Sequence, residues 1–286
     1  MTRSPGETVR RPAVAGLFYP EERRTLEEEV RRALKQASAD VSSPHHGGGL
    51  SGVVGLLVPH AGYAYSGPVA AHAYARLASF GRPRSVVLIG PDHFSGGEGL
   101  SIAPWDEWET PLGPVPLDRP LAERLMELHP ALRWGEAAHL REHSLEVQLP
   151  FLQVLFSRAP SIVPIAMSDQ RVETAVALGR VLAAAMDDGV ALVATSDLSH
   201  YVPEGEARRR DRRLLEAVQS LDAEAVERRA SELGVNMCGP GPVMALLAAM
   251  RDWGVRQARL LRYATSADAG GDPAQVVGYA AVWGRP

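Results

Sequence analysis

The sequence has one cysteine, one lysine and no long apolar run. Cys238 is the only cysteine among 286 residues, so no intramolecular disulfide can form, and a disulfide-stapled secreted protein is excluded. No apolar run reaches the roughly 18–20 residues of a membrane-spanning helix, and residues 1–11 lack the apolar core of a signal peptide. We therefore expect a cytoplasmic protein with no membrane partner.

The charge balance excludes a strongly basic, nucleic-acid-binding chain. The formal net charge is −4, and nearly all basic residues are arginine, with Lys35 the single lysine. The arginine run at 208–213 is interrupted by an acidic residue, so we interpret it as a solvated helix face and expect no nucleic-acid partner. The 45% hydrophobic content is sufficient for a large globular core.

Strand-length apolar runs alternate with segments of helical periodicity along the chain. The expected strands are 53–58, 85–89, 161–165, 190–194, 258–263 and 276–283. The expected helices are 21–37, 69–77, 172–186, 204–219, 223–232 and 242–251. Because the strands are apolar throughout, we expect them to be buried on both faces. The pattern predicts an α/β fold: a single domain over residues 1–286, built as a three-layer αβα sandwich around a largely parallel or mixed sheet.

Three further features refine this organisation. Pro164 cannot donate to a strand ladder, so we expect the strand at 161–165 to lie near an edge. Residues 38–51 predict a flexible loop, in which His45 and His46 form a surface pair. The stretch from Trp108 to Asp118 is typical of a hairpin, which we place near the mouth of the site.

Polar segments follow three of the expected strands at the point where each strand ends. His60 follows the first, His93 follows the second, and Asp197 and His200 follow the strand at 190–194. Ligands in open α/β sheets bind outside the carboxyl ends of the strands. One histidine after a strand is usually structural, but three in this position predict a functional site.

Cys238 precedes the helix expected at 242–251, in the run Cys-Gly-Pro-Gly-Pro. A helix N-terminus and a nearby metal both lower the pKa of a thiol, so we expect a thiolate; the alternative is a small buried hydrophobic residue. Two imidazoles and one thiolate make a plausible metal set, and His60, His93 and Cys238 are our candidate ligands. Zinc, copper and iron all suit such donors.

Other polar residues are candidates for supporting roles. Asp197 and His200 could orient the ligands or act as general acid and base. His143 begins a segment whose leucines share one helical face, and we place it in the site. The aromatics Trp105, Trp108 and Tyr63 could line the mouth. The remaining histidines are expected to be structural or exposed: His72, His129 and His139.

The residues quoted above, with several flanking motifs, match a known pattern. The matching segments are 11–20, 59–63, 65–67, 90–93, 108–113, 142–146, 149–150, 196–201 and 238–239. In this order, and across nearly the whole chain, they resemble the Memo family, in particular the prokaryotic members described as AmmeMemoRadiSam system protein B. That description implies a functional link to a radical SAM enzyme and an AMMECR-type protein.

The Memo family is similar in fold to class III extradiol dioxygenases, which hold iron(II) with two histidines and a carboxylate. The resemblance implies that His60 and His93 are the histidine ligands and that Cys238 stands in the carboxylate's place. It places His200 where the acid/base histidine stands and makes His143 another pocket histidine. The implied cofactor is Fe(II), with copper or zinc as alternatives, because a thiolate changes the metal preference.

Three functions stay open at this point. The first is a metal-dependent, dioxygenase-like or other redox enzyme that acts on an unknown small molecule, modified base or peptide. The second is a non-catalytic module that binds a metal or a peptide. The third is a metal-free enzyme with Cys238 as nucleophile, a histidine as base and Asp197 as the group that orients it.

Overall fold

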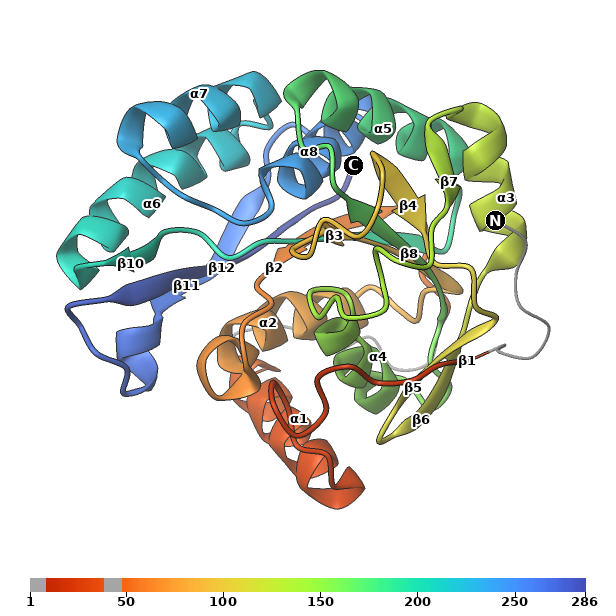
Figure 1. Cartoon of the computed structure of the whole chain (residues 1–286), viewed down its shortest axis with the longest axis horizontal. Helices are drawn as coiled ribbons and strands as arrows, with labels where there is room; N and C mark the ends of the chain where they lie inside the picture. Colours follow the sequence, from red (N-terminus) through yellow and green to blue (C-terminus); the bar gives the residue numbers. More distant parts are fainter. Residues whose placement is uncertain (1–8, 39–47) are drawn as a thin grey trace.

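The computed structural model describes residues 9–38 and 48–286 and contains one large sheet and one small sheet (Figure 1). The strands are β1 (Val9–Arg10), β2 (Val54–Val58), β3 (Ser85–Pro91), β4 (Leu100–Ile102), β5 (Glu107–Thr110), β6 (Gly113–Pro116), β7 (Leu132–Trp134), β8 (Ser161–Met167), β9 (Val190–Thr195), β10 (His200–Val202), β11 (Arg259–Thr265) and β12 (Val276–Gly284). The helices are α1 (Arg23–Ser38), α2 (Tyr63–Ala78), α3 (Arg119–Leu128), α4 (Leu149–Leu155), α5 (Val172–Ala185), α6 (Glu204–Gln219), α7 (Ala223–Leu233) and α8 (Pro240–Asp252), with short 3₁₀ turns at Glu146–Gln148 and Ser266–Ala269.

The large sheet is mixed, with a parallel centre. Within the described ranges its order is β10-β12-β2-β9-β3-β8-β4-β7, and β11 pairs with β12 beside that path. Strands β2, β9, β3 and β8 run parallel, whereas β12 and β4 pair antiparallel with the two outer members of this group. This arrangement confirms the predicted α/β class and mixed sheet.

Helices cover both faces of the sheet, as a three-layer sandwich requires. Figure 1 shows α5, α7 and α8 on one side and α1, α2 and α4 on the other. Alternate residues of β3 divide between two cores: Val87 and Ile89 join the first, and Val86 and Leu88 join the second. The alternation follows from the two-residue period of a strand. Burial on both faces explains why these strands are apolar throughout.

Strand β8 is interior, so the prediction that Pro164 marks an edge is wrong. Strand β3 lies on one side of β8 and β4 lies on the other. The Pro164 carbonyl accepts a hydrogen bond from the Ala103 backbone N–H at 3.2 Å, just after β4 ends at Ile102. The missing N–H of Pro164 therefore faces the end of the short strand β4, where no ladder bond is required.

Several elements differ in length from the prediction. Helix α2 begins at Tyr63 rather than at residue 69, because its packing on the sheet overrides the poor helix propensity of Gly67 and Pro68. The expected hairpin is confirmed as β5–β6, with Trp108 opposite Val115, but it joins β1 in the separate small sheet. Helix α3 and the short strands β4, β7 and β10 were not predicted.

The segment 38–51 is described only at its ends. Ser38 closes α1, and the buried Leu50 donates its backbone N–H to the carbonyl of Arg82 at 2.8 Å. Residues 39–47, which include His45 and His46, lie outside the described residues, so the flexible loop stays a prediction. In the part of the chain that is described, no helix is long and apolar enough to cross a membrane.

Candidate metal centre

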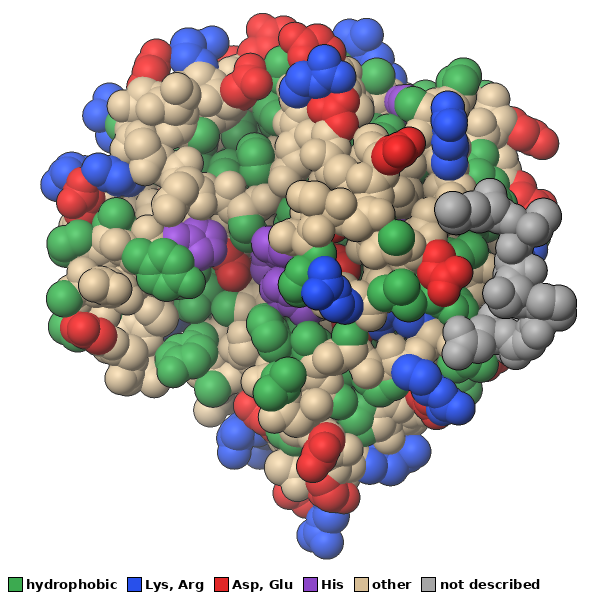
Figure 2. All heavy atoms as spheres, in the orientation of Figure 1, with side chains coloured by type: hydrophobic (Ala, Val, Ile, Leu, Met, Phe, Trp, Pro, Cys, Tyr) green, Lys and Arg blue, Asp and Glu red, His purple; other side chains and the backbone are tan. Residues whose placement is uncertain are grey.

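The candidate site lies where three adjacent parallel strands end. His60, His93 and Asp197 each follow, by two residues, the last residue of β2, β3 and β9. These strands are neighbours in the order β2-β9-β3, so their carboxyl ends meet at one edge of the sheet. Figure 2 shows histidine side chains gathered near the centre of this face, beside hydrophobic side chains.

The structure brings His60, His93 and Cys238 together although they are far apart in sequence. One ligand atom from each lies within 4.8 Å of the others. Cys238 Sγ is 3.0 Å from His60 Nε2, and the rings of His60 and His93 meet edge to face at 5.1 Å. His60 is buried, whereas the His93 side chain is 27% exposed, so solvent reaches the trio from one side. Ligand bonds of about 2.0–2.3 Å to a common ion fit this spacing.

Both histidines are held through their second ring nitrogen, which leaves Nε2 available for a metal. His60 Nδ1 lies 2.8 Å from Thr195 Oγ1, and His93 Nδ1 lies 3.0 Å from a carboxylate oxygen of Glu142. The hydroxyl of Thr195 in turn accepts a hydrogen bond from Gln148 Nε2 at 3.3 Å. Such outer partners fix the orientation of the ring and raise its basicity toward a metal. The donor set therefore fits a metal ion.

Glu142 is a functional residue that the sequence did not identify. Its carboxylate is buried and accepts the backbone N–H groups of His93, His143 and Ser144 at 2.8–2.9 Å. Burial alone would raise the pKa of this carboxyl, but the hydrogen bond and charge of His93 hold that pKa well below its usual range. Glu142 is therefore a buried anion beside His93, and no local pattern in the sequence shows that contact.

Cys238 differs from the expected free thiolate. Its Sγ accepts a hydrogen bond from the Asp197 backbone N–H at 3.1 Å, and it sits just before α8. Burial, followed by the nearby Asp197 carboxylate, raises the pKa of the Cys238 thiol, whereas the sequence predicted a lowered one. A coordinating metal deprotonates a thiol outright, so this environment suits a metal ligand better than a metal-free nucleophile.

Asp197 holds the backbone at His60 in place. Its Oδ1 accepts the backbone N–H of His60 at 2.9 Å, which fixes the turn after β2 against the turn after β9. Burial raises the pKa of the Asp197 carboxyl to about 7. Asp197, His200 and Cys238 also form a group whose ligand atoms lie within 4.8 Å of one another.

His200 is half-buried and firmly oriented. The carbonyl oxygens of Leu198 and Asn236 lie 2.8 and 3.1 Å from its Nδ1, so we assign the ring hydrogen to Nδ1. The Asn236 side chain also accepts the His200 backbone N–H at 2.8 Å. Burial lowers the pKa of His200, which leaves a neutral ring with a free lone pair on Nε2.

His143 completes the cluster. Its ring stacks on His93 at 4.6 Å and packs against Phe18 at 4.4 Å, and it meets His60 at 5.5 Å. Burial lowers the pKa of His143 to about 4, so the ring is neutral at pH 7. The structure thus gathers all six residues that the sequence proposed for the site.

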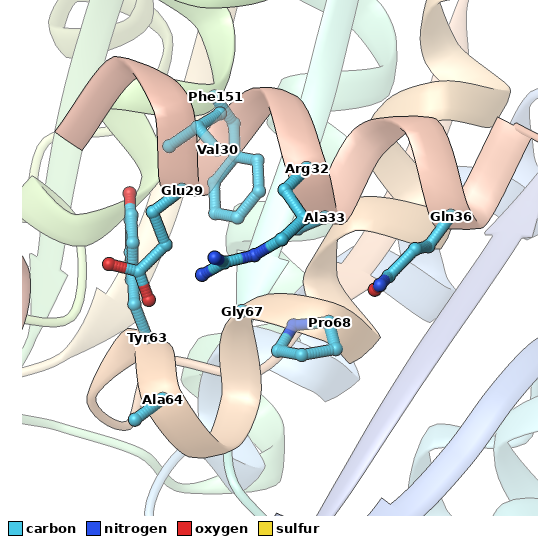
Figure 3. Close-up of a pocket in the computed structure, with 10 residues that line it drawn as sticks. All are labelled: Glu29, Val30, Arg32, Ala33, Gln36, Tyr63, Ala64, Gly67, Pro68 and Phe151. Atoms are coloured by element: carbon cyan, nitrogen blue, oxygen red, sulfur yellow. The ribbon is translucent and has the colours of Figure 1, made fainter. Parts of the chain in front are cut away.

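The aromatics considered for the mouth of the site are core residues instead. Trp105, Trp108 and Tyr63 are buried, and the Tyr63 hydroxyl donates to the carbonyl of Val147. Tyr63 lines a separate cavity of about 220 Å³ between α1 and α2 (Figure 3), and no histidine or cysteine is among the residues that line it. Exposed aromatics instead follow the site histidines directly: Phe94 after His93, and Tyr201, 71% exposed, after His200.

His139, which we expected to be structural or exposed and not part of the site, is structural. It is fully buried, and its Nε2 donates to the carbonyl of Ser101 at 3.0 Å. Its own carbonyl accepts from the guanidinium of Arg10, which lies 4.1 Å over the ring of Trp108.

A mixed sheet with a parallel centre, at whose strand ends two histidines and a cysteine converge, defines an α/β protein with a candidate metal centre. The chain belongs to the Memo family: the family model for Memo-like proteins matches residues 10–283. Relatives named MEMO1 family protein cover almost the same length. One from Methanothermobacter thermautotrophicus is 41% identical over 275 residues, covering 95% of this chain and 99% of the relative.

Further relatives come from other lineages. A MEMO1 family protein of Ignicoccus hospitalis is 42% identical over 282 residues, which are 96% of this chain and 98% of the relative. One from Thermotoga maritima is 39% identical and covers 94% and 97% of the two chains. Among solved structures, an uncharacterised protein of Escherichia coli K12 matches with a TM-score of 0.54 at 19% identity, covering 80% of this chain and 98% of that one. This last likeness supports the fold alone.

Proposed function

We propose that the chain is a metal-dependent redox protein whose ion is held by His60, His93 and Cys238. The observation that carries the proposal is the convergence of these three donors, within 4.8 Å of one another, at a partly open sheet edge. Three protein ligands leave coordination positions free, as catalytic rather than structural metal sites do.

The resemblance to class III extradiol dioxygenases favours Fe(II) as the resident ion, with copper as the redox-active alternative. Zinc has no redox chemistry, so a zinc ion here would fit the non-catalytic module instead. A redox-active ion bound here would supply electron exchange with dioxygen or with a substrate. The thiolate of Cys238 is softer than a carboxylate and broadens the choice toward copper and zinc. The substrate is proposed only as a small organic molecule or a peptide.

The residues around the trio can orient the ligands and move protons. His200, with its hydrogen on Nδ1, presents Nε2 as a proton acceptor. His143 is neutral and stacks on the ring of His93. Asp197 holds the backbone at His60, so we assign it a positioning role.

The metal-free cysteine enzyme is the weaker alternative. A nucleophilic cysteine needs a lowered thiol pKa, whereas burial raises the pKa of Cys238. That alternative also leaves His93 and its buried partner Glu142 without a task.

The exposed side chains beside the site favour a second candidate, a metal-bearing module that binds a peptide without turnover. Leu17, Phe94 and Tyr201 are exposed apolar residues in segments that contribute to the site. A binder should tolerate His200→Ala with little loss of affinity, whereas an enzyme should lose turnover by about 10²–10⁴-fold.

The test is the metal content of anaerobically purified protein, measured by elemental mass spectrometry. We expect near-stoichiometric iron or copper in wild type and loss of metal in Cys238→Ser and in His60→Ala, with His129→Ala as the matched control. No metal in wild type, together with no tight uptake of added Fe(II) or Cu(I), would overturn the proposal.

A further inference from the structure

A second feature of the structure, rich in arginine, lies at the opposite end of strand β2 from the histidines. It is a cavity of about 570 Å³ lined by Arg76, Gly254, Arg256, Gln257, Arg259, Trp283, Gly284, Arg285 and Pro286. Gly284 pairs with Gly55 near the start of β2, whereas His60 follows the end of β2. The cavity is therefore separate from the candidate metal centre.

Aromatic rings hold three of the four arginines of this cavity in place. The guanidinium of Arg76, from α2, lies 4.3 Å over the ring of Trp283 and 4.7 Å over that of Phe80. Arg285 lies 4.8 Å over Phe80, and Arg259, from β11, lies 6.0 Å over Trp283. A stacked guanidinium is pre-organised, and its N–H edge stays free for a planar, two-point hydrogen bond to an anion.

No aspartate or glutamate is among the residues that line the cavity. Among the described residues, no carboxylate lies within ion-pair distance of Arg76, Arg256, Arg259 or Arg285, although other arginines of the chain pair with Asp or Glu. The Nε of Arg76 is buried and has no hydrogen-bond partner in the described structure. Burial, and then the charges of Arg259 and Arg285, lower the pKa of Arg76. Three segments of the chain thus keep like charges together at a cost in stability.

We infer that this arginine cavity binds a small anion that carries two or more phosphate groups. Phosphate oxygens accept paired N–H bonds from arginine, and a single guanidinium can hold one phosphate group in that manner. Four arginines can neutralise more charge than one phosphate carries, and the cavity is large enough for a diphosphate. The acidic net charge of −4 disfavours a nucleic-acid backbone, which needs a broad basic surface.

The test uses inorganic pyrophosphate, titrated calorimetrically into the full chain at constant ionic strength. We expect saturable 1:1 binding in wild type, weakened about tenfold or more by Arg76→Gln and by Arg259→Gln, since each removes a charged hydrogen-bond donor. Arg124→Gln, an exposed arginine on α3, is the matched control and should bind as wild type does. The same titration on His60→Ala should give an unchanged affinity, which separates this cavity from chelation at the metal centre.

Thermal unfolding gives a second readout that a purely structural role would not produce. Without anion, Arg259→Gln should unfold at the wild-type temperature or above, because the substitution relieves repulsion between guanidinium groups. Pyrophosphate should raise the unfolding temperature of wild type and not of this variant.

Three outcomes would overturn the inference. The first is the absence of saturable pyrophosphate binding in wild type. The second is an equal loss in Arg124→Gln. The third is tighter binding of a mixed-sequence oligonucleotide that depends on the same arginines, which would assign the cavity to nucleic acid instead.

Discussion

At the scale of single residues, Glu142 determines how His93 is presented to a metal. Its carboxylate faces His93 Nδ1 at 3.0 Å and accepts the backbone N–H of the same residue at 2.8 Å. Replacing it by Gln keeps the shape but removes the charge that makes Nε2 more basic. We expect Glu142→Gln to lower metal affinity about 10–100-fold, measured by competition with a chelator.

The control for this prediction is Glu127→Gln, an exposed carboxylate on α3. It removes the same charge far from the site and should leave metal affinity unchanged. Wild-type affinity in Glu142→Gln would show that orientation by the carboxylate is not needed.

The buried residue His139 should make the stability of the fold depend on pH. Burial lowers its pKa from the ordinary 6.5 to about 4, and its Nδ1 is buried without an acceptor. The unfolded chain therefore binds a proton on this residue between pH 6.5 and 4, and the folded chain does not. The stability that neutral His139 contributes is complete above pH 6.5 and is lost as the pH falls toward 4.

The variant His139→Gln removes that titration while its amide can still donate to Ser101. We expect the difference in free energy of unfolding between wild type and variant to shrink by about 3 kcal/mol from pH 7 to pH 4. The measurement is urea unfolding at several pH values, and a difference that stays constant with pH would contradict it.

At this scale the sequence could indicate the candidate metal ligands, but not the residues that hold their rings in place. His60 and His93 stand directly after apolar runs, so their place at a sheet edge follows from a general rule of α/β folds. The contacts of Thr195 and Glu142 with those rings join segments that lie 135 and 49 residues apart, and no local pattern encodes them. The raised thiol pKa of Cys238 was missed for the same reason, because burial depends on the whole fold.

At the scale of elements, a buried ion pair helps to hold the N-terminal segment beside the site. Arg10 lies 2.6 Å from Glu146 and also donates to the carbonyls of His139 and Glu142. Breaking a buried pair leaves an unpaired charge, so Arg10→Met should lower the free energy of unfolding by about 3–5 kcal/mol in urea titrations.

The adjacent Arg11 offers a matched control. It pairs with Glu109 at the surface, where its side chain is 77% exposed, and such pairs contribute less than about 1 kcal/mol. Arg11→Met should therefore be nearly neutral. Equal losses for Arg10→Met and Arg11→Met would mean that burial of the first pair does not matter.

Most elements that carry a clear hydrophobic period could be predicted, although helix α3 was missed, and the shortest strands could not be predicted. Helix α6 has the predicted bounds, and β2, β9 and β12 differ from prediction by one residue at one end. Strands β4 and β7 have three residues each, too few for a two-residue period to be visible. Pro164 misled the prediction because its tolerance depends on where the neighbouring strand β4 stops.

At the scale of the molecule, strand order could not be predicted, yet it creates the site. Strand β9 lies between β2 and β3, so residues from three distant segments share one edge. The antiparallel strand β12 extends this sheet and carries Trp283 to the opposite edge, where the arginine cavity lies. The two sites are thus at opposite ends of the same two strands.

A bound metal should stabilise the whole fold, because its ligands come from three separate segments and it binds only when they are assembled. At a free metal concentration about 100 times the dissociation constant, the expected gain in free energy of unfolding is about 2.7 kcal/mol. His60→Ala should abolish this gain, whereas Arg259→Gln at the opposite edge should keep it in full. The measurement is anaerobic thermal unfolding with and without Fe(II). If Arg259→Gln lost the stabilisation by metal, the metal centre and the arginine cavity would be coupled through β2 and β12 instead.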